Sequence, residues 1–264
     1  MEKKIITAGL ILSCIYPAAA FTDSDLDGVD DKYDKCPNTP FNQLVGPDGC
    51  PLGKARQERI SKPKGTFYLK IGGGYSKEGS ASSISSSLSI AYARKGFYIS
   101  WTSYYYFQND YVNDSGLGNS FLYGSYAKFF GKTYTIFGLN IKLPTGKGKL
   151  TDNKFDFTPS ITLDYIRGKD DYFIYYGYTI KGDSNKKNVN TISMGAGYQI
   201  SKKFYNSLSL DMGSSAITGK MRYYLGYFCL YRFNKKYYAT FSYSYGISNA
   251  ATDHSFFGKL GVRY

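Results

Sequence analysis

The last residues of the chain alternate between apolar and polar or small positions with the period of two that is typical of a β-strand. One face of this strand carries Phe256, Gly258, Leu260, Val262 and Tyr264, and the other carries Phe257, Lys259, Gly261 and Arg263. The same alternation recurs upstream, where 220–233 and 236–247 set large apolar side chains against charged, small or hydroxyl side chains. Such a pattern predicts half-buried strands and an all-β fold.

Strand-like segments with this pattern cover most of the chain beyond residue 65. Twelve are expected, at 66–76, 82–93, 97–108, 119–130, 133–143, 154–166, 171–181, 189–200, 203–213, 220–233, 236–247 and 254–264. Short connections at 94–96, 131–132, 167–170, 201–202 and 234–235 alternate with longer ones at 109–118, 144–153, 182–188, 214–219 and 248–253. The link at 77–81 is short although it belongs with the longer set.

Each segment has about the 9–11 residues that a tilted strand needs to cross a bilayer. Outer-membrane barrels have short periplasmic turns and longer external loops, and closure pairs every backbone group within the wall. Residues 66–264 are therefore predicted to form a transmembrane antiparallel up-and-down β-barrel of about 12 strands with both ends in the periplasm. The final strand resembles the closing strand of bacterial outer-membrane barrels. A soluble β-sandwich is the alternative, but it needs neither the loop asymmetry nor a terminal aromatic.

The N-terminus has the composition of a signal peptide. Lys3 and Lys4 precede an apolar run over 5–15, and 18–20 supply the small residues of a cleavage site. We expect residues 1–20 to be removed on export. A cut before Cys14, at a weak resemblance to a lipobox, is the alternative. No other stretch reaches the ~18 consecutive apolar residues of a membrane helix.

Charge is unevenly divided along the chain. Residues 21–51 hold seven Asp and two Lys, whereas the whole chain carries +13, so an acidic segment precedes a basic domain. The abundance of Tyr (29), Phe (18) and Gly (29) favours β structure in that domain. Nucleic acid is an unsuitable partner for an exported protein. Lipopolysaccharide phosphates and anionic headgroups suit basic side chains at a membrane rim better.

Residues 23–34 space their carboxylates like a calcium loop, with Asp at positions 1, 3, 5 and 12 and Gly at position 6, where the chain must turn sharply. An EF-hand would end on Glu, but here Asp34 is followed closely by Cys36. The segment 21–51 resembles instead a thrombospondin type 3 repeat, which in outer-membrane proteins often joins a barrel to another element. That resemblance implies a periplasmic calcium site with side-chain ligands from Asp23, Asp25, Asp27 and Asp34, the carbonyl of Val29, and Asp30 as a further candidate. A disordered acidic leader is the alternative.

The cysteines indicate one disulfide. Cys36 and Cys50 are expected to pair, because an oxidising compartment favours disulfides in a module too small to build a core. Cys14 would leave with the signal peptide. Cys229 falls on the strand face assigned to lipid, where an inert buried thiol is expected. Residues 52–65 lack apolar periodicity and are predicted to be a linker.

A local motif adds a second resemblance. Residues 138–147 read Gly-Leu-Asn-Ile-Lys-Leu-Pro-Thr-Gly-Lys, and 156–159 read Asp-Phe-Thr-Pro. This pair resembles a strand end in a family of outer-membrane barrels associated with meta-pathway phenol degradation, which implies a transport role. Physically, Pro144 ends strand pairing and Gly146 allows a turn, so these residues shape a loop.

Alternation also predicts which side chains face the barrel interior. The expected pore-lining residues are Lys70, Lys128, Lys142, Asp156, Asp164, Asp211, Arg222, Arg232 and Lys259, joined by Lys181 and Arg263. Their basic excess predicts a polar, positive lumen, and small residues at 85, 87, 89, 91 and 93 leave room beside it. Because an eight-stranded barrel is just filled by side chains, twelve strands leave space for a narrow pore.

The predicted function is therefore a channel or transporter for small solutes, with no enzymatic activity. A non-conducting structural or surface-interaction barrel is the alternative. A membrane hydrolase is a remote third class, suggested by Asp253-His254-Ser255. Adjacent strand residues point to opposite faces, so these three side chains cannot form a relay among themselves.

Overall fold

The computed structural model describes Val29, residues 34–37, Thr39, residues 45–51 and residues 65–264. The chain divides into two compact units, Met1–Gln57 and Glu58–Tyr264. In the first unit a disulfide joins Cys36 and Cys50, which confirms the predicted pairing. The Thr39 hydroxyl donates to the carbonyls of Cys36 at 2.9 Å and Gly49 at 3.0 Å, so it links the two sides of the closed loop.

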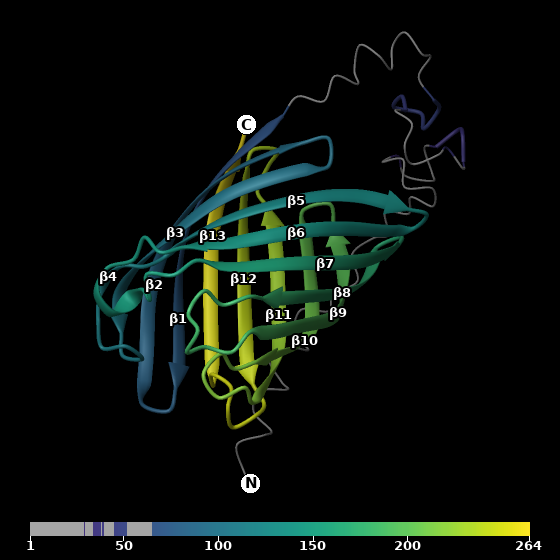
Figure 1. Ribbon diagram of the computed structural model, residues 1–264. Helices are drawn as coiled ribbons and strands as arrows, with labels where there is room; N and C mark the ends of the chain where they lie inside the picture. The colour runs from purple at the N-terminus through teal and green to yellow at the C-terminus, as the bar shows by residue number, and fades with distance from the viewer. Residues whose placement is uncertain (1–28, 30–33, 38, 40–44, 52–64) are drawn as a thin grey trace. The chain divides into compact units, whose positions relative to one another are not determined.

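The second unit is one antiparallel sheet closed into a barrel (Figure 1). Its strands are β1 (Thr66–Glu78), β2 (Ala81–Arg94), β3 (Phe97–Asn109), β4 (Gly116–Leu117), β5 (Ser120–Phe130), β6 (Thr133–Leu143), β7 (Asp156–Arg167), β8 (Asp170–Thr179), β9 (Val189–Ser201), β10 (Phe204–Ser214), β11 (Met221–Arg232), β12 (Tyr237–Gly246) and β13 (His254–Arg263). The short β4 pairs only with β3, so twelve strands form the wall, as predicted. No helix within the described residues is long and apolar enough to cross a membrane.

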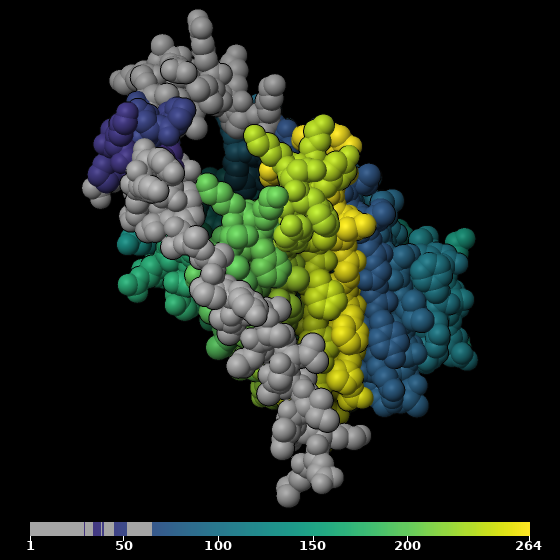
Figure 2. Space-filling model, turned by 180° about the vertical axis from the view of Figure 1, so that it is seen from behind, coloured from purple at the N-terminus to yellow at the C-terminus, as the bar shows by residue number. Residues whose placement is uncertain are grey.

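The two ends of the sheet meet at β1 and β13. Their pairing runs from Tyr68 opposite Arg263 to Lys77 opposite His254. Phe67 and Tyr264 then exchange two backbone hydrogen bonds of 3.0 Å, so the last residue of the chain takes part in closure. Figure 2 shows this junction, with yellow β13 beside blue β1. The predicted closing strand is thus confirmed.

Connections at the two ends of the barrel differ in length. Two-residue turns follow β2, β5, β7 and β9, at the end where β1 begins and β13 finishes. Lys95 and Gly96 have φ of 50° and 82°, the doubly positive pattern of a tight hairpin turn. A Cβ at Gly96 would also lie 2.5 Å from the Ala127 carbonyl oxygen, so this position requires glycine. The other end has a two-residue turn between β1 and β2 but otherwise carries the longer loops. One of these contains the 3₁₀ turn η2 (Gly148–Leu150), which was not predicted.

The polarity of the barrel is reversed relative to a soluble protein. Among the described residues, the only buried apolar side chains are Ala91, Leu150 and Ala251, and the largest side chain that is fully buried is Ser120. Large apolar side chains lie on the outward face instead; they include Phe67, Leu69, Ile71, Leu88, Ile90, Phe97, Ile99, Phe137, Ile174, Leu208, Leu225 and Leu260. An apolar belt around a polar interior is the pattern of a barrel surrounded by hydrocarbon.

Candidate functional site in the barrel interior

Strand pairing fixes which side chains face the interior. Residues paired across neighbouring strands point to the same side of the sheet, and the side alternates along each strand. Lys70 pairs with Ser89, which is only 4% exposed, so both lie on the interior face. Lys259 pairs with Gly72, two residues along β1 from Lys70. The two lysines are therefore diagonal neighbours on the interior face of adjacent strands.

We define the basic wall as Lys70, Lys259, Tyr68, Tyr98 and Phe257. The Lys70 ammonium donates to the Tyr98 hydroxyl at 3.4 Å and lies 6.0 Å and 5.9 Å from the ring centroids of Tyr68 and Tyr98. The Lys259 ammonium lies 5.0 Å from the Phe257 ring centroid. These distances are within the range of cation–π attraction. Over the described part of the chain, neither lysine has a carboxylate within 4.0 Å.

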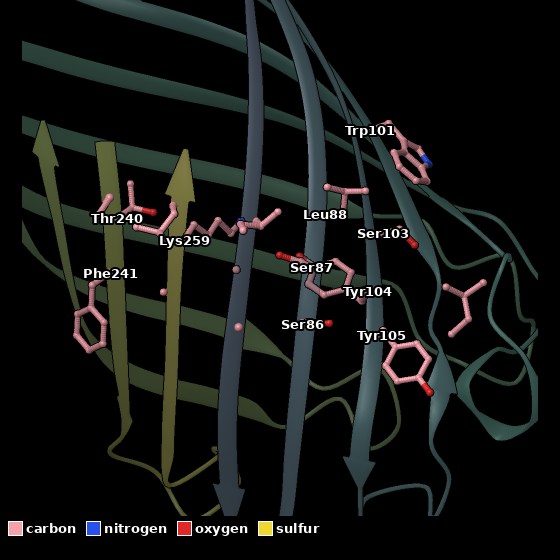
Figure 3. Close-up of a pocket in the computed structure, with 17 residues that line it drawn as sticks. Ser86, Ser87, Leu88, Trp101, Ser103, Tyr104, Tyr105, Thr240, Phe241 and Lys259 are labelled. Carbon is pink, nitrogen blue, oxygen red and sulfur yellow. The ribbon is translucent and has the colours of Figure 1, made fainter. Parts of the chain in front are cut away.

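Glycines on β1 make room for the side chains of the basic wall. A Cβ at Gly72 would lie 2.7 Å from Cγ of Lys259, and one at Gly74 would lie 2.3 Å from Cδ2 of Phe257. Both β13 side chains therefore extend across β1 at positions where β1 presents only backbone. Figure 3 shows Lys259 reaching from β13 toward β1. A larger residue at position 72 or 74 would displace them.

Acidic side chains form a second group, which we define as the acidic wall: Asp164, Asp171, Asp211, Tyr205 and Ser193. The Tyr205 hydroxyl donates to Asp171 at 2.7 Å. The Ser193 hydroxyl donates to one oxygen of Asp211, and Ser209 donates to the other at 3.1 Å. These residues stand on β7, β8, β9 and β10, which lie three to six strands from β13 and β1 around the ring of twelve. The basic wall and the acidic wall therefore occupy different sectors of the interior.

A chain of ion pairs ties the loops at the end of the barrel with longer connections. Asp152, in the β6–β7 loop, bonds Lys142 and Lys186 at 2.6 Å each, and Asp156 lies 3.0 Å from Lys142 and 2.5 Å from Lys181. We call these five residues the rim network. Burial would raise the pKa of Asp152, but hydrogen bonds from Lys142 and Lys186 hold it well below the ordinary value. The β6–β7 loop is thus fastened to the β8–β9 loop by groups that stay charged.

Further contacts fasten the same loop on its other side. Thr145 donates its hydroxyl to Ser120 at 2.8 Å, and the backbone N–H of Lys149 donates to Asp114 at 2.7 Å. The bond from Lys149, together with one from the backbone N–H of Ser115, lowers the pKa of Asp114. The β6–β7 loop is therefore held between the loops on either side of it.

The predicted pore-lining residues occupy the interior face with one exception. Lys70, Lys142, Asp156, Asp164, Asp211, Arg222 and Lys259 lie on that face, as do Lys181 and Arg263. Arg232 shares it at the end of β11, where its guanidinium reaches the Lys202 carbonyl at 3.5 Å. The structure places these side chains inside; that they line a conducting pore stays a prediction.

The prediction for Lys128 is wrong. This lysine shares its strand face with the exposed rings of Tyr126 and Phe130, and its ammonium lies 5.5 Å from the Phe130 centroid. The residue is three positions before the turn at Gly131, where a long side chain can cover apolar surface and still reach water. It is an outward residue near the edge of the apolar belt.

Sequence reasoning missed two groups that matter in the interior. Asp171 and its donor Tyr205 face inward on β8 and β10, and alternation could have placed both. Asp152 and Lys186, by contrast, lie in loops that have no periodicity, so no sequence signal paired them. The Asp171 carboxylate reduces the excess of basic over acidic side chains on the interior face but does not remove it.

The residues of the remote hydrolase alternative separate in the structure. His254 begins β13, and its Nδ1 lies 2.9 Å from the Tyr243 hydroxyl. Asp253 accepts the backbone N–H of Gly79 at 2.9 Å. Ser255 points to the other face of the sheet from His254, and its partner on β1 is Ser76. The three side chains thus have separate partners.

The calcium ligands fall mostly outside the described residues. This applies to Asp23, Asp25, Asp27 and Asp30, so the calcium site stays a prediction. Of the two that are described, Val29 and Asp34, the Asp34 carboxylate accepts the backbone N–H of Cys36 at 2.8 Å. A Cβ at Gly49 would overlap this carboxylate, so the chain packs closely around it.

The outward face carries a hollow of about 880 Å³ over β12, β13, β1, β2 and β3 (Figure 3). Small residues lie at its base, namely Gly73, Ser86 and Gly258, which are consecutive partners across three strands. Leu88, Trp101 and Phe241 border it. The hollow is lined mainly by the apolar belt, and Lys259, Tyr104 and Thr240 of the interior face also border it.

Solved structures share this architecture. The chain is similar to an outer-membrane channel from Pseudomonas putida F1, with a TM-score of 0.67, 9% identity, and coverage of 77% of this chain and 97% of that one. The NanC porin has a TM-score of 0.54 at 15% identity, covering 74% and 98%. The KdgM porin, solved with disordered oligogalacturonate, has a TM-score of 0.54 at 11% identity, covering 75% and 98%. No family model matches the chain. At such identities the likeness shows a shared fold.

Proposed function

We propose that this chain is an outer-membrane β-barrel channel for small solutes, with a net preference for anions. The observation that carries the proposal is the reversed polarity of the closed twelve-stranded barrel, apolar outside and charged inside. Hydrocarbon solvates the outward belt, and water with polar solutes occupies the interior. The neighbours of the same fold named above are channels and porins, and one of them was solved with an acidic oligosaccharide. That likeness supports the class of function.

The arrangement of the interior gives a mechanism for selectivity. Basic side chains outnumber acidic ones on the interior face, and low-dielectric walls strengthen their field. Lys70 and Lys259 present ammonium groups without a carboxylate partner among the described residues. An anion entering the barrel meets these groups on one side, while the acidic wall repels it from the other. Anions are therefore expected to pass along β1 and β13.

Orientation follows from the lengths of the connections. All the short turns except that between β1 and β2, and both ends of the sheet, lie at one end of the barrel, which is the periplasmic end in outer-membrane barrels. The first unit would then lie in the periplasm and bind calcium through Asp23, Asp25, Asp27, Val29, Asp30 and Asp34, as its resemblance implies. The rim network would face the outside, close to lipopolysaccharide.

A non-conducting structural barrel is the second candidate. The rim network favours it, because the β6–β7 loop is fastened on both sides and rings crowd the basic wall. The two candidates differ in one measurable property. A channel passes ions in discrete steps, and a filled barrel passes none.

The test is single-channel recording of the full-length, folded protein in planar bilayers with KCl. Discrete conductance steps, with a reversal potential under a salt gradient that indicates anion preference, are expected. Silence at high protein loading, with folding verified by heat-dependent migration on a gel, would establish the structural barrel instead. Steps with cation preference would retain the channel and remove the role given to the basic wall.

A further inference from the structure

We propose that the basic wall is a binding site for small aromatic carboxylates. The inference rests on the proposed function, because the solute must enter the barrel to reach Lys70 and Lys259. It goes beyond anion preference by naming the chemical class that the side chains select. The carboxylate would bind the two ammonium groups, and the ring attached to it would pack against Tyr98 and Phe257.

The anionic half of the solute is recognised by the two lysines. They are diagonal neighbours on adjacent strands, so their Cβ atoms are about 7–8 Å apart. One carboxylate can accept hydrogen bonds from two ammonium groups at this spacing, because lysine side chains are long. The described residues provide no carboxylate partner for either lysine, whereas Lys142, Lys181 and Lys186 of the rim network are all paired. Among these five inward or rim lysines, only Lys70 and Lys259 have ammonium groups available to an anion.

The aromatic half is recognised by rings on either side of the lysines. Tyr98 lies 6.4 Å from Tyr68 and 6.0 Å from Tyr123, measured between ring centroids. Tyr104 lies 6.3 Å from Phe257 in an edge-to-face arrangement, on the Lys259 side of the wall. All of these rings are half-buried, so part of each residue stays accessible to solvent. A planar ring can join such a series by stacking or by edge contact.

The rest of the interior restricts the site to one side of the barrel. Asp164, Asp171 and Asp211 stand three to six strands away around the ring of twelve and repel a carboxylate. Gly72 and Gly74 keep β1 free of side chains where Lys259 and Phe257 cross it. The arrangement therefore combines positive charge and aromatic surface at one place in the barrel. An aliphatic anion would use only the first of these features.

The experiment measures benzoate binding to the full-length folded protein in detergent by calorimetry near neutral pH. Acetate tests the charge alone, cyclohexanecarboxylate tests a saturated ring of similar size, and benzyl alcohol tests the aromatic ring alone. Benzoate is expected to bind at millimolar concentrations. Losing the aromatic contact should weaken binding by roughly two- to tenfold for cyclohexanecarboxylate. Acetate and benzyl alcohol should bind more weakly still.

Two variants and one control assign the site. Lys70→Gln and Lys259→Gln should each weaken benzoate binding by about tenfold, the effect of losing a charged hydrogen-bond partner in a half-exposed site. The matched control is Lys128→Gln, which removes an outward lysine that also lies over a ring and should leave binding unchanged. The Lys70→Arg, Lys259→Arg double variant keeps both charges and should retain binding if it folds. Heat-dependent migration verifies folding of every variant.

The outcomes separate this site from channel function. Benzoate binding that is unchanged in the glutamine variants, or equal binding of cyclohexanecarboxylate, overturns the site. A barrel that conducts KCl but binds no benzoate also overturns it and leaves the channel intact. A barrel that binds benzoate through Lys70 and Lys259 but never conducts supports the site and removes the channel.

Discussion

The Asp152→Asn variant should release the β6–β7 loop from the mouth of the barrel. Asp152 is 15% exposed and bonds two ammonium groups, Lys142 at 11% exposure and Lys186 at 32%. The amide keeps one acceptor oxygen but loses the charge, so one charge-assisted hydrogen bond disappears and the other becomes a bond from an ammonium to an uncharged oxygen, without the ion-pair attraction. Lys142 keeps Asp156 as a partner, which limits the cost. The free energy of loop opening should fall by about 2 kcal/mol, with the exposed Lys186 contributing the smaller share.

Limited trypsin digestion measures this opening, because Lys147 and Lys149 lie inside the loop. When opening and closing are fast relative to cleavage, the digestion rate follows the population of the open form. A change of 2 kcal/mol therefore corresponds to cleavage about 30-fold faster, read from the fragments by mass spectrometry. The control is Asp183→Asn, whose contact with Lys186 is 3.7 Å long and should be worth less than about fivefold.

A rate for Asp152→Asn within about twofold of the wild type would refute the reasoning, because the loop would then be held by the Thr145 and Lys149 contacts alone. The pH dependence provides a second check. Since the pKa of Asp152 is depressed in the folded protein, its contribution is present above the unfolded value of about 3.9 and is lost as the pH falls through the lower folded value. Hydrogen exchange of the loop, corrected for the intrinsic rate, should show constant protection from neutral pH to about 5 and a decline only below about 4.

Three further predictions concern closure, selectivity and the first unit. Deleting Tyr264 removes the two backbone bonds to Phe67 as well as a terminal ring, so folded yield in the outer membrane should fall further than for Tyr264→Asp, while Tyr264→Phe should assemble normally. Replacing Arg222 and Arg232 with Glu reverses the charge at both ends of β11, so the reversal potential in a KCl gradient should move toward cation preference. The shift should be smaller at high salt, because the Debye length falls to ~3 Å near 1 M. An unchanged reversal potential would mean that β11 does not face the ion path. Replacing Asp25 and Asp27 with Ala should abolish calcium-dependent heat in calorimetry of the full chain while the Cys36–Cys50 disulfide persists, and no calcium heat from the unaltered protein would remove the metal site.

The barrel could be predicted because its two determinants, the alternation along each strand and the length of each turn, are local features of the sequence. A wall that faces hydrocarbon outside and water inside forces a period of two, and β12 shows it over its whole length. Turn lengths then specify the order of the strands, since short links join neighbours. The terminal strand was assigned by the same pattern, and its pairing with β1 follows once the sheet must close.

The sequence was less informative where both faces of a strand carry rings. In β5, Phe121 and Phe129 face inward while Tyr126 and Phe130 face outward, so apolar character alone does not distinguish the two sides. The side was decided by pairing, with Gly124 opposite Leu139 of β6 and Ile99 of β3. Alternation along this strand predicted Lys128 on the inward face, but its place near a turn lets the lysine reach water along the outer surface.

The separation of charge inside the barrel follows from closure, which brings the first and last strands of the sheet side by side. Lys70 and Lys259 are far apart in the chain, near the two ends of the sheet, while Asp164, Asp171 and Asp211 come from its middle. In an open sheet these groups would form a basic edge, an acidic centre and another basic edge. Pairing of β13 with β1 joins the two basic edges into one wall and leaves the acidic centre in a different sector. A field across the interior therefore needs no local charge motif, only basic residues near both ends of the sheet and acidic ones between them.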